Sequence, residues 1–207
     1  MSENYKRLNL PKNILRETFI PELNGNDFWH IYQDIESVLN DEIINIFKTL
    51  SVVPNMVILF GANLTNRKLN QIMVHSDLYY KNNEWVDAPF GINYELGKTT
   101  TTIYWFDTNK CKYEQPMPAQ FYQYPSNIFN GKVYHKKLTD PYPINAQIIE
   151  SVTITNEENP ILFRTDVAHG VSYITETSPR FMLSIRFDVD IIKNWEQALD
   201  VFSNIIV

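Results

Sequence analysis

Two of the four histidines in the chain lie where a metal ion could be bound. His75 is followed by Ser76 and Asp77, and His169 lies far along the chain in the apolar stretch of residues 163–171. Strand residues alternate between two faces, so a strand carrying His75 and Asp77 directs both side chains to one side. A second imidazole from a distant strand then completes a set of two histidines and one carboxylate.

This ligand set favours Fe(II), because it leaves metal positions open for a chelating co-substrate and for oxygen. Imidazole and carboxylate also bind zinc, so the ligands alone do not fix the metal. Asp166 is an alternative carboxylate, but it lies three residues before His169, and this odd spacing favours a turn or a salt bridge with Arg164. The sequence predicts a structural His30 on a helix and an exposed His135 in a loop beside two lysines.

An arginine near the predicted metal strands supplies a positive charge. Arg180 opens the last predicted strand, and a hairpin from His169 brings its guanidinium beside the metal-bearing strand. A buried guanidinium needs an anion, and its planar fork pairs well with a carboxylate. Ser184 shares the strand face with Arg180 and could add a hydrogen bond. Arg186 shares that face too, and either adds to the site or pairs with an acid elsewhere. The competing interpretation is a surface Arg180 paired with Glu176.

The elements that must position these residues follow from the hydrophobic pattern. Apolar residues at spacings of three and four predict a helix over 27–53, with Asn26 or Asp27 as its cap and Pro54 as its end. The predicted strands are residues 56–60, 68–75, 91–96, 99–106, 132–134, 146–155, 161–165, 167–174 and 180–189. A short helix over 191–206 closes the chain.

This pattern predicts a mainly β protein with flanking helices, built as an all-β sandwich or barrel. We expect one domain over residues 1–207. Residues 1–55 would form an N-terminal helical support, residues 56–190 the β core, and residues 191–207 a C-terminal helix.

Composition excludes several classes of function. The net charge of −6 and the lack of a basic cluster argue against nucleic acid and against membrane surfaces as partners. The single cysteine, Cys111, allows neither an internal disulfide nor a cysteine-based zinc site. We find no signal-like start and no apolar run near the ~20 residues that span a bilayer. The expectation is a cytoplasmic protein.

Taken together, His75-Ser76-Asp77, His169 and Arg180 resemble the His-x-Asp…His…Arg signature of the 2-oxoglutarate and Fe(II)-dependent oxygenase superfamily. The resemblance covers roughly residues 56–189 and is closest to the prolyl and asparaginyl hydroxylase-like members. Residues 161–187 resemble the last three core strands of that superfamily. Asp77 argues against the halogenase variant, in which a small residue replaces the acidic ligand.

The resemblance implies a double-stranded β-helix core, also described as jelly-roll or cupin-like. It implies Fe(II) on the two histidines and Asp77, 2-oxoglutarate with its far carboxylate on Arg180, and O2. The implied reaction hydroxylates an unidentified substrate, a protein side chain or a small molecule, and releases succinate and CO2. Asn93 and Tyr104 would touch co-substrate or substrate, although core roles are the competing interpretation. No catalytic residue beyond the metal ligands is implied.

The sequence leaves two alternative hypotheses for the function open. One is a cupin-like metal enzyme that does not use 2-oxoglutarate, which differs from an oxygenase in releasing no succinate. The other is a non-catalytic β-sandwich binding protein, which would bind no stoichiometric iron. Arg180 is the feature that favours the oxygenase. The oligomeric state is not predicted.

Overall fold

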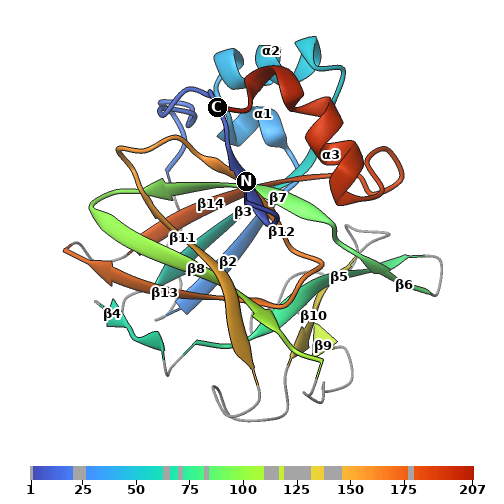
Figure 1. Cartoon of the computed structure of the whole chain (residues 1–207). Helices are drawn as coiled ribbons and strands as arrows, with labels where there is room; N and C mark the ends of the chain where they lie inside the picture. Colours follow the sequence, from blue (N-terminus) through green and yellow to red (C-terminus); the bar gives the residue numbers. More distant parts are fainter. Residues whose placement is uncertain are drawn as a thin grey trace.

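A computed structural model describes residues 2–20, 27–62, 66–69, 72–81, 84–109, 117–118, 132–137, 146–176 and 180–207, with the backbone alone for 27–29, 80–81, 117–118 and 132–137. The prediction of a mainly β protein is confirmed, because two antiparallel sheets dominate the described residues and few helices accompany them (Figure 1). No described helix has the length and apolar character needed to cross a membrane.

The first sheet has the strand order β1-β12-β7-β14-β3-β2. These strands are β1 (Tyr5–Arg7), β12 (Ile161–Arg164), β7 (Phe90–Leu96), β14 (Arg180–Phe187), β3 (Pro54–Ala62) and β2 (Asp27–Tyr32). The last long strand, β14, lies between β7 and β3, with Ser184 opposite Asn93 on one side and Ile58 on the other. Its residues are therefore at the centre of the sheet.

The second sheet has the strand order β11-β8-β13-β5-β10-β9, and two short strands attach to it. Its members are β11 (Gln147–Thr155), β8 (Thr99–Asp107), β13 (His169–Thr175), β5 (His75–Lys81), β10 (Lys132–Lys137) and β9 (Met117–Pro118), with β4 (Asn66–Arg67) on β13 and β6 (Glu84–Asp87) on β5. The predicted metal residues therefore begin two strands of the same sheet.

Strand β14 shows how the two faces of the first sheet are sorted. Leu183, Ile185 and Phe187 belong to the apolar cluster that includes the helices. Arg180 and Arg186, offset by one position, contact residues of the second sheet instead. Alternation along one strand therefore buries an apolar face under the helices and places polar side chains between the sheets.

The helices cover the outer face of the first sheet, above β14 and β7 in Figure 1. They are α1 (Ile35–Val38), α2 (Asp41–Thr49), α3 (Trp195–Val201) and the 3-10 turn η2 (Ser203–Ile205). Asn40 caps α2 by accepting a hydrogen bond from the Ile43 backbone N–H at 3.1 Å, and Asn194 caps α3 in the same way from Gln197 at 2.9 Å. The C-terminal helix is thus confirmed over a shorter range.

The predicted helix over 27–53 is wrong in its first part. Asp27–Tyr32 forms strand β2, paired with β3, and the helices begin only after the caps Asp34 and Asn40. The segment is rich in Phe, Trp, Ile and Tyr, which favour strands, and pairing with β3 prevailed over a short helical spacing. Since β1 also joins the first sheet, residues 1–55 contribute strands as well as helices to the structure.

The predicted strand over 68–75 is also wrong. His75 does not end a strand but begins one, β5, which runs on to Lys81. Apolar residues before it are buried without being in a strand, because Ile72 and Val74 pack against Phe106 and Ala168. The other strands lie close to their predicted ranges, which were set by clear alternation or by turn residues.

Candidate metal centre

The starts of β5 and β13 bring the predicted ligands together. The two strands meet at one register pair, His75 opposite His169, and the ring centroids of these histidines are 4.5 Å apart. Asp77 follows two residues along β5, on the same face. One ligand atom from each of the three residues lies within 4.8 Å of the others. The structure thus brings together residues that are 92 positions apart in sequence (169 − 77).

Both imidazoles are oriented by the backbone. The Nδ1 atom of His75 lies 3.0 Å from the carbonyl oxygen of Met73, and the Nδ1 atom of His169 lies 2.9 Å from that of Val167. A carbonyl only accepts hydrogen bonds, so each Nδ1 carries a proton, and in the neutral imidazole the lone pair is then on Nε2. That tautomer is the one in which Nε2 binds a metal ion.

The Asp77 carboxylate is buried, 2% exposed, and its two oxygens have different neighbours. Oδ2 accepts a hydrogen bond from Nη2 of Arg186 at 2.8 Å. Oδ1 lies 3.6 Å from Nε2 of His75. The guanidinium therefore holds one oxygen, and the other oxygen is on the side of the histidines where a metal ligand is needed.

Arg186 is itself held on several sides. Its Nε donates to Ser184 Oγ at 3.0 Å and its Nη1 to Thr165 Oγ at 3.2 Å. The guanidinium lies 5.7 Å from the centre of the Phe163 ring. A Cβ atom at Gly91 would lie 3.0 Å from Arg186 Nε, so glycine leaves the room that this side chain occupies. Arg186 is fixed in place and fixes Asp77 in turn.

These residues fit a divalent metal ion. Two imidazole nitrogens and one carboxylate oxygen converge from one side, as in sites with open positions for other ligands. Asp77 and His169 are buried and His75 is half-buried. A cation here would complete a cluster in which Asp77 already shares its charge with Arg186.

Arg180, the predicted co-substrate residue, lies on the same strand face as Arg186 and is also buried, 4% exposed. Its Nη2 donates to Glu95 Oε2 and to Thr101 Oγ, each at 2.9 Å, and the guanidinium lies 4.6 Å from the centre of the Tyr173 ring. The competing prediction of a surface arginine paired with Glu176 is wrong. The anion facing Arg180 is the protein's own Glu95.

Glu95 was missed by sequence reasoning. It lies two residues after Asn93 on β7, so both side chains point between the sheets, and this spacing was the available signal. Burial raises the pKa of the Glu95 carboxyl above its ordinary value, against the opposing influence of Arg180 and of the hydrogen bond with Thr101. Within the described residues, neither Glu95 Oε1 nor Asn93 Oδ1 has a hydrogen-bond partner.

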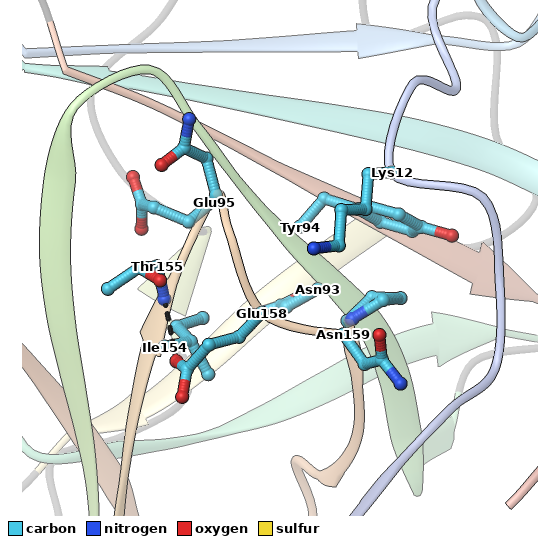
Figure 2. Close-up of a pocket in the computed structure, with 10 residues that line it drawn as sticks. Lys12, Asn93, Tyr94, Glu95, Ile154, Thr155, Glu158 and Asn159 are labelled. Carbon is cyan, nitrogen blue, oxygen red and sulfur yellow. Dashed lines mark hydrogen bonds between the residues drawn. The ribbon is translucent and has the colours of Figure 1, made fainter.

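A small pocket reaches this end of the interior (Figure 2). Its empty space, open mouth included, is about 260 Å³. Glu95 and Thr155 lie toward one side in Figure 2, and Lys12 and Tyr94 toward the other. The dashed line marks the hydrogen bond from the Thr155 backbone N–H to Glu158. Asn93 and Glu95 thus line both the interior near Arg180 and a pocket at the sheet edge.

Tyr79, close to the Asp77–Arg186 pair, is a second residue that the sequence analysis did not single out. It follows Asp77 by two residues on β5 and is buried. Burial, with a smaller contribution from the Asp77 charge and opposed by Arg186, raises the pKa of the Tyr79 phenol to about 12. The phenol therefore stays protonated throughout the neutral range.

The remaining predicted residues separate into two groups. Ser184 and Asn93 lie between the sheets, where Ser184 accepts from Arg186 and the Asn93 amide lies 3.6 Å from Met182 Sδ. Tyr104 lies on the opposite face of β8 from Thr101 and Trp105. It packs against the cluster that contains Ile72 and Val74 and receives a hydrogen bond from Ser172 at 3.2 Å. The structure does not bring Tyr104 to the metal group.

Three predictions on other residues can be compared with the structure. The salt bridge between Asp166 and Arg164 is confirmed at 3.0 Å. His30 lies in strand β2 rather than on a helix, and His135 lies in strand β10 rather than in a loop, in register with Asp77. Cys111 lies outside the described residues.

Comparisons of the chain with models of protein families, with curated proteins and with solved structures found no match.

Proposed function

We propose that the protein is an Fe(II)- and 2-oxoglutarate-dependent dioxygenase that hydroxylates a protein side chain or a small molecule, releasing succinate and CO2. The observation that carries this proposal is the convergence of His75, Asp77 and His169. Two histidines and a carboxylate on one side of Fe(II) leave positions at which the metal can activate oxygen. In this proposal the protein's side chains orient the metal ligands, bind the far carboxylate of 2-oxoglutarate and hold the substrate near the metal.

We further propose that the two sheets form a double-stranded β-helix. In chain order, the eight strands that support this are β3, β5, β7, β8, β11, β12, β13 and β14. Counted from one to eight, they lie in the orders 1-8-3-6 and 2-7-4-5 in the two sheets. Successive strands alternate between the two sheets except for the fourth and fifth, β8 and β11, which pair with each other, and this is the pattern of paired Greek keys in a jelly roll.

The co-substrate side of the proposal rests on Arg180. Its guanidinium faces the same space between the sheets as Arg186, which touches the metal ligand Asp77. Asn93 and Ser184 lie on that face between the two arginines and are the proposed further contacts. Hydrogen-bond donors of this kind suit a ligand with a carboxylate at each end.

The test measures metal and co-substrate binding separately. Anaerobic titration should show one Fe(II) per chain in the wild type. In His169→Ala, affinity should fall more than about 100-fold, since losing residues that only support ligands already costs about 10–100-fold. His30→Ala removes a histidine from β2 and is the matched control. Fe(II)-dependent formation of succinate from 2-oxoglutarate should disappear in His169→Ala. Equal metal binding by His169→Ala and the wild type would end the proposal.

Arg180→Met addresses the co-substrate. We expect 2-oxoglutarate affinity to fall by about 2–5 kcal/mol while Fe(II) binding persists, because a buried charge partner of the ligand is lost. A 2-oxoglutarate affinity that survives this change would move the co-substrate site away from Arg180.

A second candidate is a metal-dependent β-sandwich enzyme that does not use 2-oxoglutarate. One observation favours it: Arg180 already has a carboxylate partner in Glu95. This enzyme would bind a divalent metal through the same three residues but would show no 2-oxoglutarate binding to the metal-loaded protein.

A further inference from the structure

At the Arg180 end of the interior, two buried acceptor atoms have no hydrogen-bond donor among the described residues. Glu95 Oε2 is shared by Arg180 and Thr101, but Glu95 Oε1 and Asn93 Oδ1 have no partner within the part of the chain that the structure describes. Both side chains are almost fully buried, at 5% and 2% exposure. Buried acceptors without donors are unfavourable, so this region is suited to receiving a proton or a donor group.

We propose that Glu95 is a built-in competitor for the co-substrate's far carboxylate, and that it releases Arg180 by taking up one proton from solvent when the dicarboxylate binds. This inference rests on the proposed function, since it concerns the same 2-oxoglutarate site. It makes Glu95 the residue that sets co-substrate affinity.

Charge balance at this buried position determines what happens when the dicarboxylate binds. Arg180 and Glu95 form a neutral buried pair with N and O atoms 2.9 Å apart. Adding a second carboxylate beside one guanidinium would leave an uncompensated negative charge away from water. Two carboxylates that share a site cannot both stay ionised, and the pKa of one is strongly raised. A neutral Glu95 restores the balance. Its new O–H can donate to an acceptor on its own strand face, where Asn93 Oδ1 has no donor among the residues that the structure describes.

Among the described residues, the other charged side chains that line this pocket have partners other than Glu95. Lys12, from the N-terminal segment, lines the pocket but donates to the backbone carbonyl of Glu157. Glu158, from the turn before β12, accepts from Arg7 at 3.1 Å and from the Thr155 backbone N–H. From β8, Glu95 is faced by the uncharged Thr101.

The phenols nearby complete the set of titratable groups. Tyr94 is the neighbour on β7, and Tyr173 of β13 lies against the Arg180 guanidinium. Burial raises the pKa of Tyr94 well above its usual range, so that phenol does not titrate near neutrality. Burial also raises the pKa of Glu95, in the direction that eases its protonation.

The experiment counts protons during binding. The protein is loaded with Ni(II), a redox-inert divalent ion for this ligand set. 2-Oxoglutarate is titrated into it calorimetrically, in buffers of different ionisation enthalpy and at increasing pH. For the wild type we expect uptake of one proton per 2-oxoglutarate bound. The dissociation constant should rise about tenfold per pH unit wherever Glu95 is ionised in the free protein.

Glu95→Gln keeps the shape of the side chain and removes the competing charge. This variant should bind 2-oxoglutarate at least tenfold more tightly at neutral pH, take up no proton at this position, and have a dissociation constant that no longer rises with pH. Glu158→Gln removes a carboxylate that lines the same pocket and should behave as the wild type does. Thermal unfolding of each variant verifies that it is folded.

The outcomes separate the two proposals. If 2-oxoglutarate binds the wild type without proton uptake, or if Glu95→Gln binds it equally or more weakly, the role of Glu95 is refuted and the proposed function stands. If neither the wild type nor Glu95→Gln binds 2-oxoglutarate while both bind Ni(II), the proposed function fails.

Discussion

Each end of the space between the two sheets contains a buried arginine–carboxylate pair, and the two ends differ in the residues that surround this pair. At one end Arg186 contacts Asp77 at 2.8 Å, and at the other Arg180 contacts Glu95 at 2.9 Å. Both arginines belong to β14 and both pairs are buried. Asp77 has two imidazoles beside it, whereas Glu95 is next to Asn93 and hydroxyl groups.

This difference determines which cation each carboxylate can accept. The histidines add neutral nitrogen ligands, so a metal ion can neutralise Asp77 as well as Arg186 does. Glu95 has no such group of ligands around it among the described residues, and its cationic partner there is Arg180. Under the proposed function, the arginine–carboxylate pair would therefore stabilise a metal ligand at one end and restrict an anion site at the other.

The largest expected effect comes from removing one arginine at a time. Arg186→Met leaves Asp77 buried without its cation, and we expect the free energy of unfolding to fall by about 3–5 kcal/mol. Arg180→Met should cost a similar amount through Glu95. Chemical unfolding with and without a saturating divalent metal then distinguishes the ends, because the metal replaces the lost charge only at Asp77.

We therefore expect metal to recover a large part of the loss in Arg186→Met and little of it in Arg180→Met. The double variant Asp77→Asn/Arg186→Met is the control, since it removes both charges and should recover stability without metal. If the metal raised the free energy of unfolding of Arg186→Met and Arg180→Met equally, the proposed difference between the Asp77 end and the Glu95 end would be wrong.

The sequence predicted the three residues of the candidate metal centre because each of them has a signal in its local pattern. His75 and Asp77 alternate on one strand, and His169 lies in a strand with clear apolar neighbours. The partners of the two arginines were not predictable in this way. Arg180 finds Glu95 across 85 residues and Arg186 finds Asp77 across 109, and the strand order that joins them is a property of the whole sandwich.

Local pattern also failed where tertiary pairing competed with it. Residues 27–32 have a helical spacing of apolar residues, yet they pair with β3 as strand β2. The buried residues Ile72 and Val74 alternate as a strand does, but β5 begins only at His75. In both cases the apolar pattern marked a real element or a buried segment, and the type or the range of the element was not predicted correctly.

The next effect concerns the pH dependence of stability at the Glu95 end. The pKa of Glu95 is raised in the folded protein, so folding favours its protonated form over a carboxyl near the ordinary value of 4.5. The stability that Glu95 contributes is full below that value and is lost as the pH rises through the folded pKa. The free energy of unfolding of Glu95→Gln, relative to the wild type, should increase by up to ~1.4 kcal/mol per pH unit and then level off.

Urea unfolding of both proteins across a pH series measures this difference in the free energy of unfolding. The contributions of the carboxylates that both proteins contain cancel in the difference. The pH at which the curve levels off also marks where proton uptake on co-substrate binding should be complete. A difference that does not change with pH would mean that Arg180 keeps Glu95 ionised throughout, and the two ends would then be electrostatically alike.

The smallest expected effect on stability is that of Ser184→Ala, which removes a hydrogen bond without removing a charge. Ser184→Ala removes the acceptor of Arg186 Nε, a bond of 3.0 Å in which the donor is charged. We expect the free energy of unfolding to fall by about 1.5–3 kcal/mol, the range for hydrogen bonds to charged groups. Because Arg186 and Asp77 still balance each other in this variant, a divalent metal should stabilise it by the same amount as the wild type. A larger metal-dependent gain in Ser184→Ala would mean that this hydroxyl is required to hold Arg186 on Asp77, and that the metal end depends on the serine as much as on the arginine.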